Sequence, residues 1–491
     1  MATHDSPIVL VTGVNGHIGS TATAAFIAAG YRVRGTVRSL EKHQASLSEA
    51  FQSHIDAGLL QVIGIPDFNA DGAFDDAVKG VHAIAHTSPP GLRFDEYVGG
   101  PKAIIERARR STQNLLSSAE AHAGATLKSV VLVSSLAAMM RLQDEPGYRY
   151  TGDEFNTEYI DLSLQAGDEA GLGLLYGAVK VAEEQAFWDH LSDPQRKSTF
   201  TGAVVSPSFV AGPILVRPAE PDSMTPSMKT VWYIYAGAVW PDEFPMPTWV
   251  DVRDVAKAIV FGVQEPEKAK GRRFLLAAYR VGRQAFADVL REKIPERKDV
   301  IREGTPGKGY PADFVTWGAE EVGMDGSRLT ELSGQGYLPF EECAVGTAKS
   351  FDPYLAEGKE KRYTEEVPVL FHALRNLAVG LGGAWSLVNP RTSLIHFGFP
   401  ARIADRPETW PVARVGHART MSLGLIMALF YARGQYDVVD TIMGVMAGSL
   451  ALVDGCVEWN EGFHAWAVFR FVGAGAFSAL GFAGSTQGPV C

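Results

Sequence analysis

The segment of residues 8–29 constrains the fold more than any other part of the chain. Residues 8–12 (IVLVT) form an apolar, β-prone run, and residues 21–29 form an alanine-rich run suited to a helix. Between them lie Gly13, Gly16 and Gly19. A buried strand, a glycine turn and a helix in this order are typical of the first unit of a parallel α/β sheet.

Further strand-like runs follow at residues 31–37, 60–65, 81–86 and 130–134, with helix-like stretches between them. Strands that alternate with helices predict a doubly wound, Rossmann-type parallel sheet. Residues 130–133 (VVLV) are apolar throughout, which suits a sheet that helices cover on both faces.

A chain of 491 residues predicts two or three domains, and 46% hydrophobic with 21% charged residues is a globular composition. Residues 209–250 are rich in Pro, Trp, Tyr and Met, and we expect an irregular segment within a small substrate lobe. Residues 352–362 are charged and lack apolar periodicity, which predicts a linker. The predicted domains are residues 1–361 and residues 362–491.

The charge balance and the cysteines exclude several classes of function. With 45 basic and 56 acidic residues the net charge is −11, and no basic run marks a nucleic-acid surface. Cys343, Cys456 and Cys491 form no CxxC pair, so we predict neither disulfides nor a metal site. Residues 1–7 are polar and resemble no secretory signal, so we expect a cytoplasmic location.

The glycine turn predicts a dinucleotide-binding site. Gly13 can make the tight turn, Gly16 lets the backbone approach a pyrophosphate, and Gly19 lets the helix pack on the strand. The phosphates would meet the N–H groups at the helix N-terminus; an ordinary glycine turn is the alternative. The predicted contacts are Gly13, Asn15, Gly16, His17, Ile18 and Gly19.

The end of the second strand predicts which dinucleotide binds. An acidic residue there would bind the ribose 2′-hydroxyl of NAD, whereas an arginine accommodates the phosphate of NADP. The sequence has Arg38 at this point and no acidic residue before Glu41. Arg38 is therefore the predicted phosphate ligand, with Lys42 as a second, and NADPH the predicted cofactor. A solvated surface arginine is the alternative.

Two further motifs predict carbonyl chemistry. Tyr176 and Lys180 are four residues apart in a helix-like stretch, so their side chains share one helix face. A neighbouring ammonium favours the phenolate form of a tyrosine, which otherwise exchanges protons poorly near neutral pH. Ser134 and Ser135 end the strand-like run of residues 130–134, at the edge where α/β sheets bind ligands. We expect Ser135 to be catalytic and Ser134 to be structural.

The TGxxGxxG turn, the serine pair and the Tyr-xxx-Lys pair together resemble the extended short-chain dehydrogenases. The resemblance covers residues 7–361 and is strongest to the branch of dihydroflavonol reductases, cinnamoyl-CoA reductases and fungal aldehyde and ketone reductases. Val179 departs from the serine that this family usually has before the lysine. The resemblance implies that Asn114 holds a water near Lys180, that Asp67 lies near the adenine, and that Thr87 and Pro207 line the cofactor.

The resemblance also implies a mechanism. A hydride passes from the nicotinamide to a substrate carbonyl, Tyr176 donates the proton, and Ser135 hydrogen-bonds the same oxygen. Lys180 holds the ribose hydroxyls. Aromatic residues are expected either to form a hydrophobic substrate pocket or to pack in the core of the small lobe: Trp232, Tyr233, Tyr235, Trp240 and Phe244.

Residues 362–491 predict a second, all-α domain. Four apolar segments, residues 368–388, 421–432, 438–453 and 465–483, indicate a four-helix bundle that is either soluble or associated with a membrane. Their lengths and charged residues leave both readings open, and we favour membrane association.

The second domain resembles a family of small hydrophobic four-helix proteins of unknown function. Its polar residues either converge in a pocket or lie at helix ends: Arg419, Asp454, Glu458 and His464. The domain would be a second catalytic module or an anchor.

The leading hypothesis is an NADPH-dependent ketone or aldehyde reductase of fungal secondary metabolism that acts on a hydrophobic molecule. One alternative is an epimerase or hydroxysteroid-type dehydrogenase of the same fold. A regulator that senses NADP without turnover is the other, although such proteins typically lose the Tyr-Lys pair.

Overall fold

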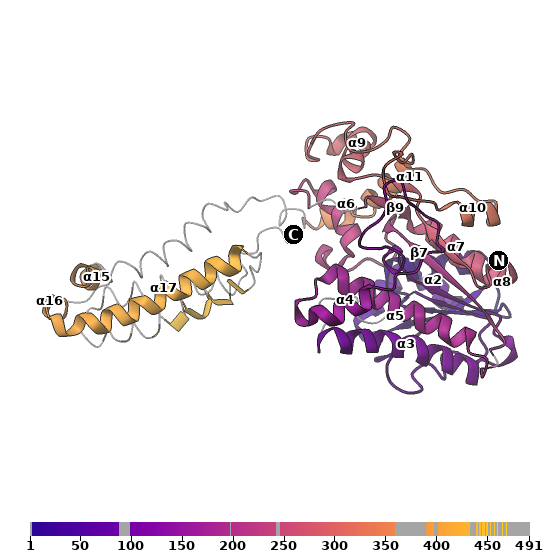
Figure 1. Ribbon diagram of the computed structural model, residues 1–491, viewed down its shortest axis with the longest axis horizontal. Helices are drawn as coiled ribbons and strands as arrows, with labels where there is room; N and C mark the ends of the chain where they lie inside the picture. Colours follow the sequence, from indigo (N-terminus) through magenta and orange to yellow (C-terminus); the bar gives the residue numbers. More distant parts are fainter. Residues whose placement is uncertain are drawn as a thin grey trace. The chain divides into compact units, whose positions relative to one another are not determined.

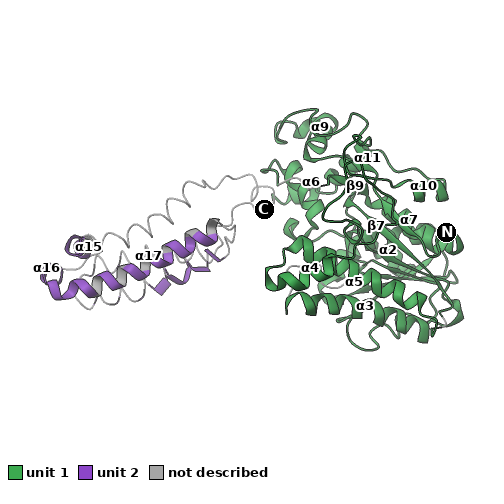
Figure 2. Cartoon of the chain, viewed as in Figure 1, with its two compact units in different colours: residues 1–359 green, residues 360–491 purple. Residues whose placement is uncertain are grey.

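The computed structural model divides the chain into two compact units, residues 1–359 and residues 360–491 (Figure 2). The structure describes residues 2–87, 99–196, 198–241, 246–358, 389–396 and 401–432, and scattered positions from 438 to 468.

A seven-stranded parallel sheet forms the centre of the first unit (Figure 1). The strand order reverses at β1, which pairs with β2 on one side and β4 on the other. This is the doubly wound sheet that the sequence predicts. In spatial order the strands are β10 (Arg273–Leu276), β7 (Thr201–Pro207), β5 (Ser129–Val133), β4 (Ala83–His86), β1 (Ile8–Thr12), β2 (Arg32–Val37) and β3 (Leu60–Gly64).

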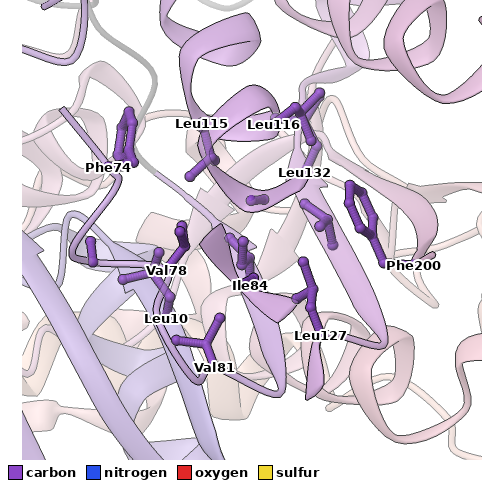
Figure 3. Close-up of a cluster of buried hydrophobic side chains, with 14 of the residues drawn as sticks. Leu10, Phe74, Val78, Val81, Ile84, Leu115, Leu116, Leu127, Leu132 and Phe200 are labelled. Carbon is purple, nitrogen blue, oxygen red and sulfur yellow. The ribbon is translucent and has the colours of Figure 1, made fainter. Parts of the chain in front are cut away.

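Helices cover both faces of this sheet. On one face, Leu115 and Leu116 of α3 (Gly100–His122) pack over strand residues Leu10, Ile84 and Leu132 (Figure 3). The helix α5 (Leu172–Ser192) lies beside α3 and adds to the same cluster. Burying each such side chain contributes about 1.5–3 kcal/mol to folding. The helices α1 (His17–Ala28) and α7 (Val252–Gln264) cover the other face.

Residues 209–250 are more regular than the sequence predicts. They contain α6 (Pro226–Ala236), which Thr225 caps at its start and Gly237 ends in the left-handed conformation, φ 81°. The aromatic side chains that made the segment look irregular are buried against the rest of the lobe, so tertiary packing stabilises this helix. The lobe's sheet is formed by β8 (Phe209–Ala211), β9 (Thr248–Asp251) and β11 (Tyr279–Arg280).

The remaining elements of the first unit complete the lobe and the outer layer. A two-stranded parallel sheet joins β6 and β12. The elements are α2 (Leu40–Asp56), β6 (Arg149–Tyr150), α4 (Tyr159–Ala166), α8 (Pro266–Ala269), α9 (Arg283–Lys293), β12 (Gly323–Met324), α10 (Ser327–Ser333), α11 (Phe340–Lys349) and α12 (Asp352–Ala356).

The predicted linker of residues 352–362 is wrong at its start, because α12 belongs to the first unit. Tyr354 is fully buried and its hydroxyl donates to the carbonyl of Pro218 at 2.6 Å. The Tyr235 hydroxyl donates to Asp352 at 2.8 Å. This stretch is mostly charged, and its single buried aromatic residue, Tyr354, produces no apolar periodicity that would predict a packed helix.

The residues of the second unit that the structure describes are almost all helical. Its helices are α15 (Pro390–His396), α16 (Ala401–Ala404) and α17 (Trp410–Ala432). The helix α17 begins well before the apolar segment predicted at residues 421–432, because Arg414 and His417 are polar but fully compatible with a helix. Residues 368–388 and most of 465–483 lie outside the described residues.

Of the four polar residues of the second unit that would form a pocket, the structure describes two, so the pocket stays a prediction. Arg419 and His464 are exposed, and Asp454 and Glu458 lie outside the described residues. Several apolar side chains of α17 are exposed as well, including Leu425 and Leu429. None of the helices that the structure describes is both long enough and apolar enough to span a bilayer, so the membrane prediction has no support here.

Candidate active site

The candidate site lies at the carboxyl ends of the parallel strands, next to the point where the strand order reverses. Thr12 ends β1 and is in register with His86, the last residue of β4. The Thr12 hydroxyl is 2.9 Å from His86 Nδ1 and accepts from the backbone N–H of Thr87 at 3.0 Å. The Thr87 hydroxyl in turn donates to the carbonyl of Thr12 at 2.5 Å. These bonds tie the two central strands together at the edge where open α/β sheets bind ligands.

The glycine turn approaches its neighbours too closely for side chains. Gly13 has φ 70°, and its carbonyl accepts from the N–H of Gly16 at 2.9 Å. A Cβ on Gly19 would lie 2.2 Å from the Gly13 carbonyl oxygen and 2.9 Å from the Thr87 hydroxyl. The turn is therefore a backbone cradle that only glycine can form.

The N-terminus of α1 faces this cradle. Within the described residues its N-cap, Gly16, makes no side-chain cap, and the first turn of the helix contains no acidic residue. The first N–H groups of α1 and the positive end of its dipole suit a phosphate. Asn15 contacts His43 at 3.4 Å, and Ile18 is half-buried in the first turn.

His17 joins the turn to the small lobe. Its Nε2 lies 3.1 Å from the carbonyl of Gly212, in the loop after β8. Burial lowers the pKa of the imidazole to about 4, against the smaller raising effect of that carbonyl. A neutral His17 therefore donates to Gly212. The sequence suggested a cofactor contact at His17 but not this link.

Arg38 and Lys42 lie where the sequence predicts the ribose phosphate. Arg38 directly follows β2 and is exposed, and Lys42 lies in the first turn of α2. Ser39 between them caps α2 by accepting from the backbone N–H of Lys42 at 3.3 Å. Asp67 is exposed in the loop after β3, where its carboxylate accepts from the backbone N–H of Asn69 at 2.9 Å.

Tyr176 and Lys180 lie on α5 with their side chains on one face. Lys180 is only 3% exposed, and its Nζ donates to the carbonyl of Val133, at the carboxyl end of β5, at 3.5 Å. A second contact, at 3.3 Å, joins Nζ to the carboxylate of Glu183. Tyr176 is half-buried. The packing of α5 on the sheet thus brings the lysine to the edge where the strands end.

Ser134 and Ser135 have different partners. The Ser134 hydroxyl donates to the carboxylate of Glu184 at 2.7 Å, in a buried contact. Ser135 Oγ accepts from the N–H of Ala137 at 3.2 Å, which leaves its hydroxyl hydrogen available for a ligand. This arrangement agrees with a structural Ser134 and leaves Ser135 as the candidate for catalysis.

Asn114 binds the loop that follows β3. Its side-chain amide donates to the carbonyls of Phe68 and Ala70 at 3.0 and 3.1 Å. The apolar residues of α3 that pack on α5 are Ile104, Ile105 and Ala108. The role of Asn114 in holding a water near Lys180 stays a prediction.

The other predicted positions fall into three groups. Pro207 is buried at the end of β7, and the hydroxyls of its neighbours Ser206 and Ser208 are buried with no hydrogen-bond partner among the described residues. Phe244 lies outside the described residues. The aromatic residues Trp232 and Tyr235 pack on α12 in the core of the lobe rather than in a pocket, Tyr233 is buried, and Trp240 is half-buried.

Sequence reasoning missed two buried carboxylates, Glu183 and Glu184. Glu184 is fully buried and forms an ion pair with Arg273 at the start of β10. It also accepts from the Trp188 indole at 3.0 Å. Two adjacent glutamates directly after the Tyr-Lys pair, with apolar residues on both sides, were the signal that such partners exist.

The residues at this edge fit a dinucleotide. The turn needs the positive φ of Gly13 and leaves no room for a side chain at Gly19. The N-terminus of α1 lacks a side-chain cap among the described residues, and Arg38 stands where an NAD-specific site has an acid. His86 Nε2 is buried without a hydrogen-bond partner in the part of the chain that the structure describes. Such orphaned polar atoms at a strand edge are a mark of a ligand site.

Comparison with known proteins identifies the family. Residues 9–277 match the NAD dependent epimerase/dehydratase family. The chain belongs to this family. Residues 376–484 match a domain of unknown function, DUF4267, in agreement with the predicted resemblance of the second domain.

Three relatives illustrate the similarity. A putative uncharacterized oxidoreductase of Schizosaccharomyces pombe is 31% identical over 349 residues, which is 70% of this chain and 96% of that protein. A putative NADPH-dependent methylglyoxal reductase of Candida albicans is 29% identical, over 69% of this chain and 96% of that protein. The fold is similar to that of yeast methylglyoxal/isovaleraldehyde reductase complexed with NADPH, with a TM-score of 0.60, 24% identity and coverage of 72% of this chain and 99% of that chain.

Proposed function

We propose that this protein reduces a ketone or aldehyde carbonyl on a hydrophobic small molecule, an intermediate of secondary metabolism, to an alcohol. That the chain is an oxidoreductase with NADPH as its cofactor follows from its family and its relatives. One observation carries the proposal: α5 places Tyr176 and Lys180 on one face, and Lys180 reaches the carbonyl of Val133 at the ligand-binding edge.

In the proposed reaction, bound NADPH supplies the hydride to the carbonyl carbon. Tyr176 donates a proton to the oxygen as charge develops there, and the Ser135 hydroxyl donates a hydrogen bond to the same oxygen. Lys180 provides a fixed positive charge beside the tyrosine. A buried ammonium acts strongly on its neighbours because little water screens it.

We expect different residues to bind the pyrophosphate, the 2′-phosphate, the adenine and the nicotinamide of the cofactor. The turn from Gly13 to Gly19 and the N-terminus of α1 would hold the pyrophosphate, with Asn15, His17 and Ile18 around it. Arg38 and Lys42 would hold the 2′-phosphate, Asp67 would lie near the adenine, and Thr87 and Pro207 would line the nicotinamide side.

A hydrophobic substrate is supported by the residues that follow β7. Phe209 and Val210 are half-buried and come directly after Ser208, whose hydroxyl is buried and without a hydrogen-bond partner among the described residues. An apolar surface next to a few polar groups is the usual composition of a site for small molecules.

The test is a panel of hydrophobic aldehydes and ketones offered with NADPH, with the alcohols identified by mass. We expect stoichiometric loss of NADPH and formation of alcohol, and a fall in kcat of about 10²–10⁴-fold for Tyr176→Phe with NADPH binding unchanged. Full activity in Tyr176→Phe would defeat the assignment. An interconverted sugar nucleotide without net consumption of NADPH would identify the epimerase alternative, and binding without turnover the regulator.

The role of the second unit is tested by its products. We propose that residues 362–491 are a second module, either catalytic, acting on the alcohol, or an anchor. The full-length protein is compared with residues 1–358, which keep α12. A dehydrated, isomerised or cyclised product from the full-length protein alone would support a second active site, whereas identical alcohols would indicate an anchor.

A further inference from the structure

A third side chain continues the catalytic face of α5. Tyr176, Lys180 and Glu183 are spaced i, i+4 and i+7, so they form one stripe along the helix. Glu183 therefore lies one turn behind the lysine, inside the molecule.

Glu183 is almost completely enclosed and has one partner among the described residues. It is 1% exposed, and its Oε2 is 3.3 Å from Lys180 Nζ. Its Oε1 is buried without a hydrogen-bond partner in the described part of the chain. The adjacent Glu184 differs in this respect, because Ser134, Trp188 and Arg273 all bind its carboxylate. Three groups therefore bind the Glu184 carboxylate, whereas Lys180 is the one partner that the described residues give to Glu183.

We propose that Glu183 is a positioning residue of the reductase site, which in its ionised form holds the Lys180 ammonium in place behind Tyr176. The inference rests on the proposed function and adds a residue to it. A lysine side chain has four rotatable carbons and no fixed direction, and the Val133 carbonyl alone is a weak partner at 3.5 Å. An ionised carboxylate forms a charge-assisted bond, roughly twice as strong as a neutral one.

The charged and titratable groups around the pair allow Glu183 to change its charge near neutral pH. Burial raises the pKa of Glu183 to about 7, and the Lys180 ammonium opposes this shift only in part. His86, on β4, faces Lys180 and stays neutral, because burial and the ammonium lower its pKa to about 3. Glu184, next along α5, is bound to Arg273 and Ser134.

Protonation of Glu183 should therefore loosen Lys180 as the pH falls through about 7. We expect kcat for carbonyl reduction to drop by about tenfold across this range in the wild type, because a misplaced catalytic group costs at least that much. The substrate KM should change little, since Glu183 does not reach the crevice.

The first experiment measures pH profiles of kcat and KM for three variants. Glu183→Gln imitates the protonated form, so its kcat should be flat near pH 7, at the level the wild type reaches in acid. Glu183→Asp should restore part of the acid limb. Asp189→Asn, which removes an exposed carboxylate from the same helix, should keep the wild-type profile. A Glu183→Gln profile that keeps the acid limb, at any absolute rate, would overturn the proposal.

The second experiment needs no turnover and separates this inference from the proposed function. Because the folded pKa of Glu183 lies above its unfolded value, the stability it contributes is complete below about pH 4.5 and is lost as the pH rises through about 7. The Tm of the wild-type apoprotein relative to Glu183→Gln should therefore fall by at least about 2 °C between pH 5 and pH 8. A constant Tm difference would show that Glu183 does not titrate there, whatever substrate the enzyme uses.

Discussion

The two ends of the proposed cofactor site are built from different parts of the chain. The glycine turn, residues 13–19, is a backbone structure: what matters at Gly19 is that no Cβ stands beside the Gly13 carbonyl. The proposed reactive residues, Ser135, Tyr176, Lys180 and Glu183, would act through their side chains, and buried polar contacts hold Lys180 and Glu183. Substitutions that add atoms should weaken cofactor binding at the glycine turn, whereas substitutions that remove polar groups should slow the reaction. The two ends of the site can therefore be distinguished by substitution.

The largest effect is expected at the proposed reactive residues. Ser135→Ala removes one donor to the developing oxyanion, and we expect kcat to fall by about 10²–10³-fold with the Kd for NADPH unchanged. Steady-state kinetics and NADPH fluorescence titration measure the two quantities.

Ser134→Ala is the matched control for this prediction. It removes a partner of the buried Glu184, so it should lower the Tm and leave most of kcat. If Ser134→Ala instead lost the greater part of kcat, the assignments of the two serines would have to be exchanged.

The glycine turn should respond in binding rather than in chemistry. The added methyl of Gly19→Ala would overlap the Gly13 carbonyl, which is backbone and cannot move aside, so we expect the Kd for NADPH to rise by about 100-fold. At Gly16 a Cβ would be 3.3 Å from the same oxygen, so Gly16→Ala should be much milder. Fluorescence titration measures both Kd values. An equal rise in the Kd for NADPH in the two variants would show that the close approach of Gly19 to the Gly13 carbonyl does not decide binding.

The smallest effect is expected at Arg38, where the site distinguishes two cofactors. Arg38→Ser should raise the Kd for NADPH by about tenfold, the value of one exposed charged contact to a phosphate, and leave the Kd for NADH almost unchanged. Parallel titrations with both cofactors provide the measurement. A proportional loss for NADH would mean that Arg38 supports the fold rather than the phosphate.

Local sequence patterns predicted those parts of the molecule whose conformation depends mainly on residues close together in the sequence. The strands β1 to β5 and the turn at Gly13 depend on apolar runs and on backbone freedom, and both are visible in a short window of sequence. The spacing of Tyr176 and Lys180 likewise needs only a helix.

Contacts between residues that are distant in sequence explain what the local patterns did not predict. Asn114 was assigned by its place in a motif, but the carbonyls that bind its amide belong to a loop 44 to 46 residues earlier. The segment around Tyr354 looked like a linker because its acceptor, Pro218, is 136 residues away. Glu184 pairs with Arg273, the first residue of β10, and no window of sequence contains both.

The helix α12 has a consequence for how such a chain can be inherited. Tyr354 is buried, and Glu357 forms an ion pair with Arg217 at 2.7 Å. These two contacts fix the last turn of the first unit to the rest of that unit. Both contacts are made by residues before position 358, so a gene that gains or loses the sequence beyond it keeps them. A shortened gene that ends after residue 358 would therefore still encode the contacts that fix the last turn of the first unit.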